Sequence, residues 1–391
     1  MHRKDGHNNK AALRYYKIFH NFYRIKSTSS FVVQFYTTIN FIFCLLHIFK
    51  CSGMTEVLND IDMVLECFPP ILYTLMGLIL YINVMVHAKQ INDVFYKMRD
   101  DWDTLTSEYE VDIMNKYGRK CRYLTIIYII GMFGHLAVYH LSHGLPVLIN
   151  HFKKNDKPRP YLFILKLGDF QKHYVLVSFY SYLAGYVGSF GMVNGYTILL
   201  MFLEHACGVF EIIGHRLTVI IQENPESINK VGSRKKLQRE INICVTMHRR
   251  VLLFINDIQN IFSIPYLFVF GFSVIMLSIS GVQSVLSMNR DARDSVRFGV
   301  FTICQVMHIY ILTIPTQHLL DNSLILSTCI YDTNWYHLST EGKRLLLMVM
   351  RKGSEPTTFI VGKIFILSLQ FFTKVLQTSM SYFTVLMSVR G

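Results

Sequence analysis

Acidic and basic residues are missing from six long stretches of this 391-residue chain. These stretches are 27–49, 67–88, 123–152, 173–203, 258–289 and 298–320, and the shortest of them has 22 residues. A helix rises 1.5 Å per residue, so about 20 apolar residues cross a hydrocarbon core roughly 30 Å thick. The missing charges therefore exclude an ordinary soluble domain and predict six membrane spans.

Cysteine pairs are missing as well. The eight cysteines contain no CxxC pair, so neither a zinc site nor a disulfide framework is predicted. Cys51 and Cys67 flank the first predicted outer loop and could form a bridge, although free thiols fit better. His135, His140 and His143 have a spacing that resembles a metal site, yet no carboxylate or cysteine accompanies them. We therefore expect no metal, no cofactor, no catalytic residues and no enzyme activity.

What the chain does contain is apolar and basic. Hydrophobic residues make up 51% of it, and the mean hydropathy is +0.31. Lysine and arginine exceed aspartate and glutamate by 39 to 26. With a cytoplasmic N-terminus, 26 basic residues lie inside and 11 outside. This bias predicts an N-in, C-out orientation and no nucleic acid partner, although loop 143–172 carries six basic residues against it.

The charge pattern divides the chain into four parts, and the expected fold is an all-α integral membrane protein with seven transmembrane helices. Residues 1–30 are basic and aromatic, which fits an amphipathic segment on membrane lipid. Residues 31–320 hold spans one to six with cytoplasmic extensions of spans four and five. Residues 321–356 combine charges with an apolar face, which fits a cytoplasmic helical anchor. Residues 357–391 contain a seventh apolar segment, about 50 Å long if it is fully helical.

Two patterns within the spans predict how the helices are used. Glycines recur in the fourth span, at Gly185, Gly188, Gly191 and Gly195, and small residues at this spacing let membrane helices approach closely. The last helix carries a polar stripe of Thr373, Gln377, Ser381 and Thr384, and its opposite side presents Phe371, Val375, Tyr382 and Val385. The stripe predicts a pore-lining face, with hydrogen bonding inside a bundle as the alternative.

Particular residue types recur at fixed offsets between residues 322 and 389. They are Tyr331, Trp335, Tyr336, Arg344, Leu345, Leu346, Met350, Pro356, Phe365, Phe372, Lys374, Ser379, Ser381, Tyr382, Phe383, Thr384 and Leu386. This pattern resembles the C-terminal signature of insect odorant receptors. The tail after Tyr382 differs from gustatory receptors and from the coreceptor, so a tuning odorant receptor fits best. A gustatory-type chemoreceptor channel is the alternative, and a G-protein-coupled receptor, with its outside N-terminus, fits less well.

The resemblance implies the odorant-binding subunit of a ligand-gated, non-selective cation channel. Such a chain forms a heterotetramer with the odorant receptor coreceptor in the plasma membrane of olfactory neuron dendrites. The resemblance places subunit contacts at Tyr331, Trp335, Tyr336, Arg344 and Leu345. It places a pocket for a small volatile organic ligand in the outer halves of spans two, three, four and six. The candidates there are Tyr73, Met76, His135, Val138, Tyr139, Phe179, Tyr182, Leu183, Tyr186, Phe298, Phe301 and Gln305.

Overall fold

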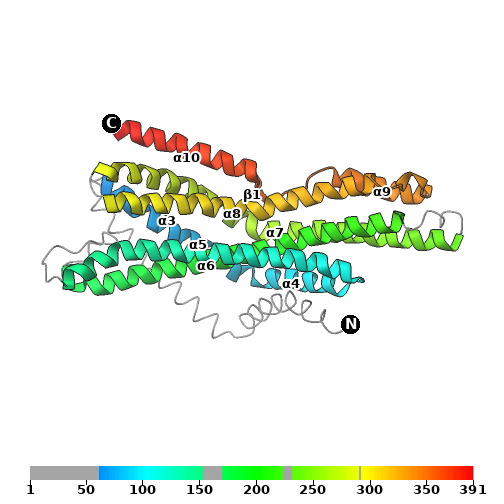
Figure 1. Cartoon of the computed structure of the whole chain (residues 1–391), viewed down its shortest axis with the longest axis horizontal. Coiled ribbons are helices and arrows are strands. Elements are labelled where there is room, and N and C mark those ends of the chain that lie inside the picture. The colour runs from blue at the N-terminus through cyan, green and yellow to red at the C-terminus, as the bar shows by residue number, and fades with distance from the viewer. Residues whose placement is uncertain (1–60, 153–169, 223–230, 290–291, 391) are drawn as a thin grey trace.

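The computed structural model describes residues 61–152, 170–222, 231–289 and 292–390. The predicted N-terminal segment 1–30, the first span 27–49, Cys51 and the side chain of His143 lie outside what it describes. The described residues form a bundle of long helices that run roughly along one axis (Figure 1).

Eight α-helices make up the described part of the bundle. They are α3 (Ile61–Val86), α4 (Ala88–Asp103), α5 (Glu108–Phe152), α6 (Phe170–Gln222), α7 (Val231–Leu286), α8 (Ala292–Tyr331), α9 (Thr340–Gly353) and α10 (Leu369–Arg390). Short 3-10 turns occur at Ser287–Asn289 and Trp335–His337. With 53 and 56 residues, α6 and α7 are about 80 Å long, far more than a hydrocarbon core needs. Both helices therefore continue well beyond a bilayer.

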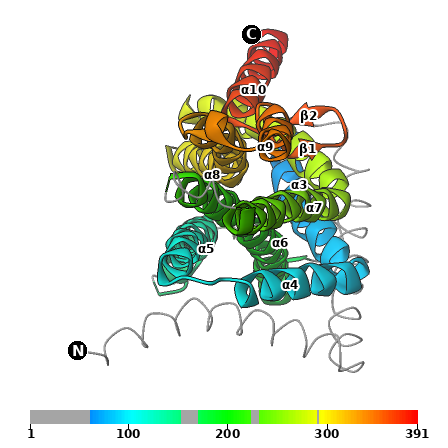
Figure 2. The ribbon, with the colours of Figure 1, turned by 90° about the vertical axis from the view of Figure 1, so that its right-hand side faces the viewer.

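The bundle has two ends of different character. The pocket end is where α5 ends, where α6 and α8 begin, and where the C-terminus lies (Figure 1). The ion-pair end holds α4 and α9. The helix α6 lies at the centre, where it packs on α3, α5, α7 and α8 (Figure 2). All residues of α6 from 195 to 210 are buried, which makes this helix the core of the fold.

Five of the described helices are long and apolar enough to cross a membrane. Their candidate spans are Phe68–Val86, Glu108–Ser142, Tyr182–Gln222, Lys235–Leu286 and Asp294–Tyr331. These segments contain most of the predicted spans two to six. The helix α10 has 22 residues but is not among the five, because its polar residues lower its hydropathy.

The glycines of α6 bring its backbone against α3. A Cβ atom on Gly77 would lie 2.1 Å from the carbonyl oxygen of Gly188, and one on Gly191 would lie 2.1 Å from the carbonyl oxygen of Gly77. Gly195 faces the side chain of Leu80. Gly185 instead faces Leu136 of α5. Close helix packing through these glycines, as predicted from their spacing, is confirmed.

The segment that starts at residue 357 is not one continuous helix, so α10 begins later than predicted. Strands β1 (Ile360–Val361) and β2 (Phe365–Ile366) pair antiparallel, with Ile360 opposite Ile366 and Val361 opposite Phe365. Gly362 and Lys363 both have positive φ angles, of 62° and 61°, which form the tight turn of this hairpin. Ser263 of α7 holds the turn by accepting a hydrogen bond from the Gly362 N–H and donating one to the Ile360 carbonyl.

Candidate functional site

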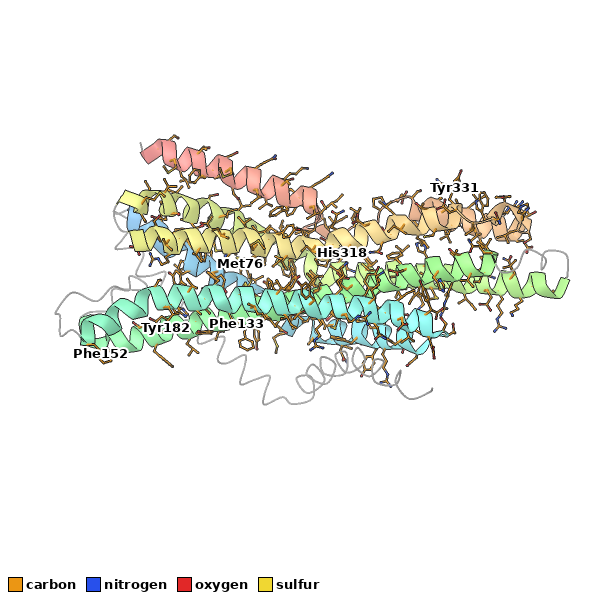
Figure 3. All side chains as sticks on the ribbon, viewed as in Figure 1. Met76, Phe133, Phe152, Tyr182, His318 and Tyr331 are labelled. Carbon is orange, nitrogen blue, oxygen red and sulfur yellow. The ribbon has the colours of Figure 1, made fainter. Side chains whose placement is uncertain are left out.

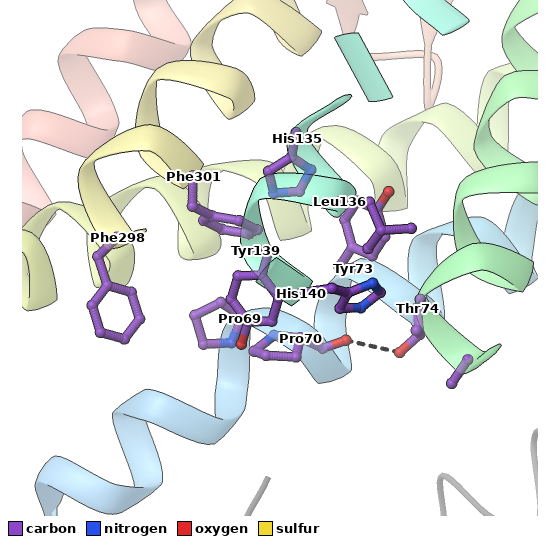
Figure 4. A pocket seen from close by; sticks show the side chains of 12 residues that line it. Pro69, Pro70, Tyr73, Thr74, His135, Leu136, Tyr139, His140, Phe298 and Phe301 are labelled. Carbon is purple, nitrogen blue, oxygen red and sulfur yellow. Dashed lines mark hydrogen bonds between the residues drawn. The ribbon is translucent and has the colours of Figure 1, made fainter. Parts of the chain in front are cut away.

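A cavity opens between α3, α5, α6 and α8 at the pocket end (Figure 4). Its free volume is about 40 Å³, far below the roughly 300–1,000 Å³ of sites that bury drug-sized ligands. The lining residues are Pro69, Pro70, Tyr73, Thr74, His135, Leu136, Tyr139, His140, Ala184, Gly185, Phe298 and Phe301. Unless side chains move, the cavity accepts only a small molecule.

Hydrogen bonds inside the protein fix the hydroxyl groups of the α3 wall. The Tyr73 hydroxyl lies 2.5 Å from Ser189 Oγ, and Ser189 donates to the Gly185 carbonyl, so Tyr73 is the donor to Ser189. Thr74 donates to the carbonyl of Pro70, one turn earlier in the helix. Both protons are used within the wall, and the face that these residues present to the cavity is mainly apolar.

Aromatic rings form most of the remaining wall. The His135 imidazole lies between two of them, 5.9 Å from the centroid of Tyr73 and 5.1 Å from that of Phe301 (Figure 4). The guanidinium of Arg297 lies 4.5 Å from the centroid of the Phe298 ring, and Arg297 is not among the residues that line the cavity. No aspartate, glutamate, lysine or arginine occurs among the described residues that line the cavity. Such a wall suits an uncharged, largely apolar ligand.

The helix α10 presents its predicted polar stripe to the outside of the chain. Thr373, Gln377, Ser381 and Thr384 are all exposed. The hydroxyls of Thr373, Ser381 and Thr384 donate to carbonyls of their own helix at 2.8, 3.0 and 2.8 Å. Because the protons are used there, the oxygen lone pairs of the stripe are left free to accept.

The opposite face of α10 packs on α7, but not with all the residues predicted for it. Phe371 meets Phe270 edge to face at 5.1 Å, and the Ser278 hydroxyl donates to the Ser379 carbonyl at 3.1 Å. Phe383 covers Gly281. Tyr382 and Val385 were expected on the packed side, but both are more than half exposed. Tyr382 and Val385 are each offset by one residue from the face that α7 covers, and one residue corresponds to a rotation of roughly 100° about the helix axis.

These features agree with what the comparisons with known proteins found. Residues 60–380 match the model of the 7tm Odorant receptor family. The chain belongs to the insect odorant receptor family. Its fold is accordingly that of an all-α, multi-pass membrane protein with seven transmembrane helices.

Individual relatives are distant in sequence. Odorant receptor 13a of Drosophila melanogaster is 24% identical over 61% of this receptor, and odorant receptor 85b of the same fly is 25% identical over 59%. The matched regions span 59% and 57% of those two proteins. The solved structure of the olfactory receptor OR5 from Machilis hrabei with eugenol superposes with a TM-score of 0.79, covering 98% of this chain and 100% of that one at 11% identity.

Five of the twelve odorant-site residues predicted for this receptor line the cavity: Tyr73, His135, Tyr139, Phe298 and Phe301. The prediction missed the other seven lining residues: Pro69, Pro70, Thr74, Leu136, His140, Ala184 and Gly185. Helical spacing could have found those on α3 and α5, because residues 69, 70, 73 and 74 of α3 repeat the offsets of 135, 136, 139 and 140 of α5. In the sequence, His140 was considered for its metal-like spacing with His135 and His143.

The other seven predicted residues lie outside this cavity. Met76 and Gln305 are buried about one turn from lining residues, and Tyr182 contacts His140 with ring centroids 4.4 Å apart. Figure 3 shows Met76 and Tyr182 on the pocket side of His318. Val138, Phe179, Leu183 and Tyr186 are exposed on the outside of the bundle by 40 to 63%. Contact of these seven with an odorant stays a prediction.

At the ion-pair end, hydrogen bonds to buried carboxylates join the helices. Glu110 of α5 accepts two hydrogen bonds from Arg216 of α6, at 2.6 and 2.7 Å, and a third from the Thr106 N–H. Glu204, which is 1% exposed, accepts from His318 of α8 at 2.8 Å. A second cavity here measures about 760 Å³, but arginine and glutamate line it, so it does not suit an apolar volatile.

The residues predicted to contact other subunits also lie toward the ion-pair end. Tyr331 and Tyr336 are 66% and 54% exposed, and Arg344 is exposed on α9. Trp335 and Leu345 pack partly against the core of the chain. Exposed tyrosines beside a half-buried tryptophan are a composition found at protein interfaces, so a role for these residues in assembly stays a prediction.

Proposed function

We propose that this receptor is the odorant-binding subunit of a ligand-gated, non-selective cation channel that it forms with the odorant receptor coreceptor. The observation that carries the proposal is that one chain combines a small apolar cavity with a separate polar helix face. The cavity lies between α3, α5, α6 and α8, and the polar face belongs to α10. A chain that only bound a ligand would have no need of the second feature.

The cavity supports a small volatile molecule as the ligand. Phe298, Phe301 and Tyr139 supply aromatic surface, and burial of apolar area is the main source of affinity for such a molecule. The olfactory receptor OR5 was solved with eugenol, a compact aromatic molecule, on the same fold. Eugenol is therefore a rational first probe for this receptor.

The stripe on α10 supports a water-filled path. Polar side chains that face lipid are unfavourable, so four exposed polar residues in one row call for water or for a partner subunit. Their free oxygen lone pairs favour cations over anions. No carboxylate lies on the stripe, which supports weak selection among cations.

Assembly with the coreceptor is supported by how little α10 touches its own chain. Its inner face packs on α7 and α8, and its outer face points away from the bundle (Figure 2). If four subunits were arranged round one axis, their α10 stripes would face one another across it. The helix α9 and Tyr331 would remain available for contacts beneath the membrane. By the charge count, the pocket end faces outward, and we place the channel in the dendrite membrane of olfactory neurons.

Current in excised membrane patches tests the proposal. Cells that express this chain with the coreceptor should give odorant-evoked cation current, with eugenol as the first probe, in inside-out patches without GTP. Patches with the coreceptor alone provide the control. A current that requires G-protein activation contradicts the proposal.

A further inference from the structure

One hydrogen-bonding atom in the cavity wall has no partner. It is Nε2 of His135, which belongs to a side chain that is 8% exposed. The imidazole lines the cavity between the rings of Tyr73 and Phe301 (Figure 4). Because neither ring face accepts a strong hydrogen bond, the two rings leave this nitrogen unsatisfied.

The neighbouring hydroxyl groups already have hydrogen-bond partners. The Tyr73 hydroxyl is bonded to Ser189, and the Thr74 hydroxyl is bonded to the carbonyls of Pro70 and Ile71. A ligand that used either group would have to break an existing hydrogen bond. A ligand that reached Nε2 of His135 would break none, because it is the one buried polar side-chain atom without a partner among the described residues that line the cavity. The nitrogen is itself buried, so the wall must shift for a ligand to reach it.

An unsatisfied buried polar group costs roughly 1–3 kcal/mol, and a ligand that bonded to this nitrogen would recover that cost. A neutral imidazole nitrogen either donates or accepts a hydrogen bond, according to its tautomer. It can therefore serve a carbonyl oxygen or a hydroxyl group. A charged ligand group is disfavoured, because no charged side chain among the described lining residues would neutralise it.

We propose, on the basis of the function proposed above, that the cavity selects uncharged ligands with a compact hydrocarbon body and one hydroxyl or carbonyl oxygen. Nε2 of His135 forms the hydrogen bond to that oxygen. The aromatic wall binds the body through apolar burial, and His135 sets the preference for oxygenated molecules over hydrocarbons of the same shape.

Two pairs of probes of equal shape separate these contributions. The alcohol 1-phenylethanol pairs with cumene, in which a methyl group replaces the hydroxyl. The ketone acetophenone pairs with α-methylstyrene, in which a methylene group replaces the oxygen. Dose–response curves are recorded for the receptor with its coreceptor, for His135→Phe, which keeps an aromatic ring without nitrogen, and for His135→Gln, which keeps a hydrogen-bonding group. Surface labelling accompanies each variant.

The unchanged receptor should prefer the oxygenated member of at least one pair. His135→Phe should raise the effective concentration of that member roughly 2- to 12-fold, as the loss of one hydrogen bond predicts, with little effect on its hydrocarbon partner. His135→Gln should retain part of the preference. If His135→Phe shifts both members of each pair equally, or if the receptor has no oxygen preference, the inference is wrong.

Phe301→Ala distinguishes this failure from a failure of the proposed function. The change removes apolar wall and no hydrogen bond, so it should weaken all four probes alike. If it does so while His135→Phe also acts on all four alike, the cavity binds odorants but His135 only packs. If Phe301→Ala leaves all four curves unchanged, the cavity is not the odorant site and both proposals are contradicted. If none of the four probes activates the receptor, the assigned ligand class is wrong.

Discussion

The two ends of the bundle are held together by different chemistry. At the ion-pair end, Glu110 with Arg216 and Glu204 with His318 join α5, α6 and α8 through hydrogen bonds to buried carboxylates at 2.6 to 2.8 Å. At the pocket end, the joints are backbone contacts such as Gly77 with Gly188, and aromatic rings at 4 to 6 Å. A paired buried charge has few alternative arrangements, whereas ring contacts tolerate small displacements. The ion-pair end is therefore the more rigid of the two, and the pocket end offers adaptable contacts to a ligand.

The largest expected contrast between the two ends is their side of the membrane. Basic residues predict that the pocket end, with the C-terminus, faces outward and the ion-pair end faces the cytoplasm. An epitope tag at the C-terminus should be stained in intact cells. A tag at the N-terminus should be stained only after permeabilisation, and staining of that tag in intact cells would reverse the assignment.

Removing one member of the Glu110 pair should destabilise the ion-pair end strongly. The side chains of Arg216 and Glu110 are only 13% and 4% exposed. Glu110→Gln removes the carboxylate that accepts from Arg216 and leaves the Thr104 carbonyl as its remaining oxygen acceptor, at a cost of about 1–3 kcal/mol. Thermal unfolding of the purified receptor in detergent would measure this. The exposed pair of Lys352 with Glu355 offers the control, since Lys352→Met should produce no measurable change. Equal effects of the two changes would mean that the Glu110 pair does not hold this end of the bundle together.

Close packing at the pocket end can be tested with two glycines. Gly77→Ala places a Cβ atom 2.1 Å from the backbone of Gly188 and forces α3 and α6 apart. Overpacking of this kind lowers the free energy of unfolding by about 1–3 kcal/mol. Gly134→Ala meets nothing within 4 Å and should leave the unfolding temperature unchanged or slightly higher. A receptor that tolerates both changes equally does not depend on the glycine contact.

Substitutions in the turn of the β1–β2 hairpin should change the free energy of unfolding by a smaller amount. Gly362→Ala adds a side chain at a φ of +62° and 2.7 Å from Leu267, whereas Lys363→Gly relieves a non-glycine residue at +61°. The first change should cost about 1–2 kcal/mol, and the second should be neutral or stabilising. Both are measured by thermal unfolding. A larger loss from Lys363→Gly would mean that the lysine side chain, rather than the turn geometry, matters.

The sequence predicts the spans better than it predicts the faces of the helices. Runs without charge located spans two to six, because charged groups are excluded from hydrocarbon wherever the helix lies. The glycine spacing likewise predicted the contact of α6 with a neighbour. The choice of neighbour and the buried face of each helix both depend on how the helix is rotated about its axis. Because all sides of a membrane helix are apolar, the sequence does not mark the buried face. For this reason Val138 and Phe179 were expected in the pocket but lie outside the cavity, while Thr74 and His140 line it.

The hairpin was missed because its residues, from Thr357 to Ile366, are as apolar as a membrane helix. The signal that marks it is Gly362 beside Lys363, a weak pattern for a turn with two positive φ angles. The polar stripe of α10 was predicted correctly as a set that shares one face, because a step of three or four residues fixes it whatever the tertiary packing is.

The central claim, that one chain carries a ligand site and a separate ion path, is tested by a reciprocal pair of changes. Phe301→Ala removes an aromatic wall of the cavity, and a loss of about 1–3 kcal/mol corresponds to a 5- to 150-fold rise in effective odorant concentration with unchanged ion selectivity. Gln377→Glu adds a carboxylate to the stripe and should raise relative divalent-cation permeability or block, with the odorant rank order unchanged. Surface expression is measured for both. If Gln377→Glu changes odorant selectivity while Phe301→Ala changes ion selectivity, the two sites are assigned the wrong way round.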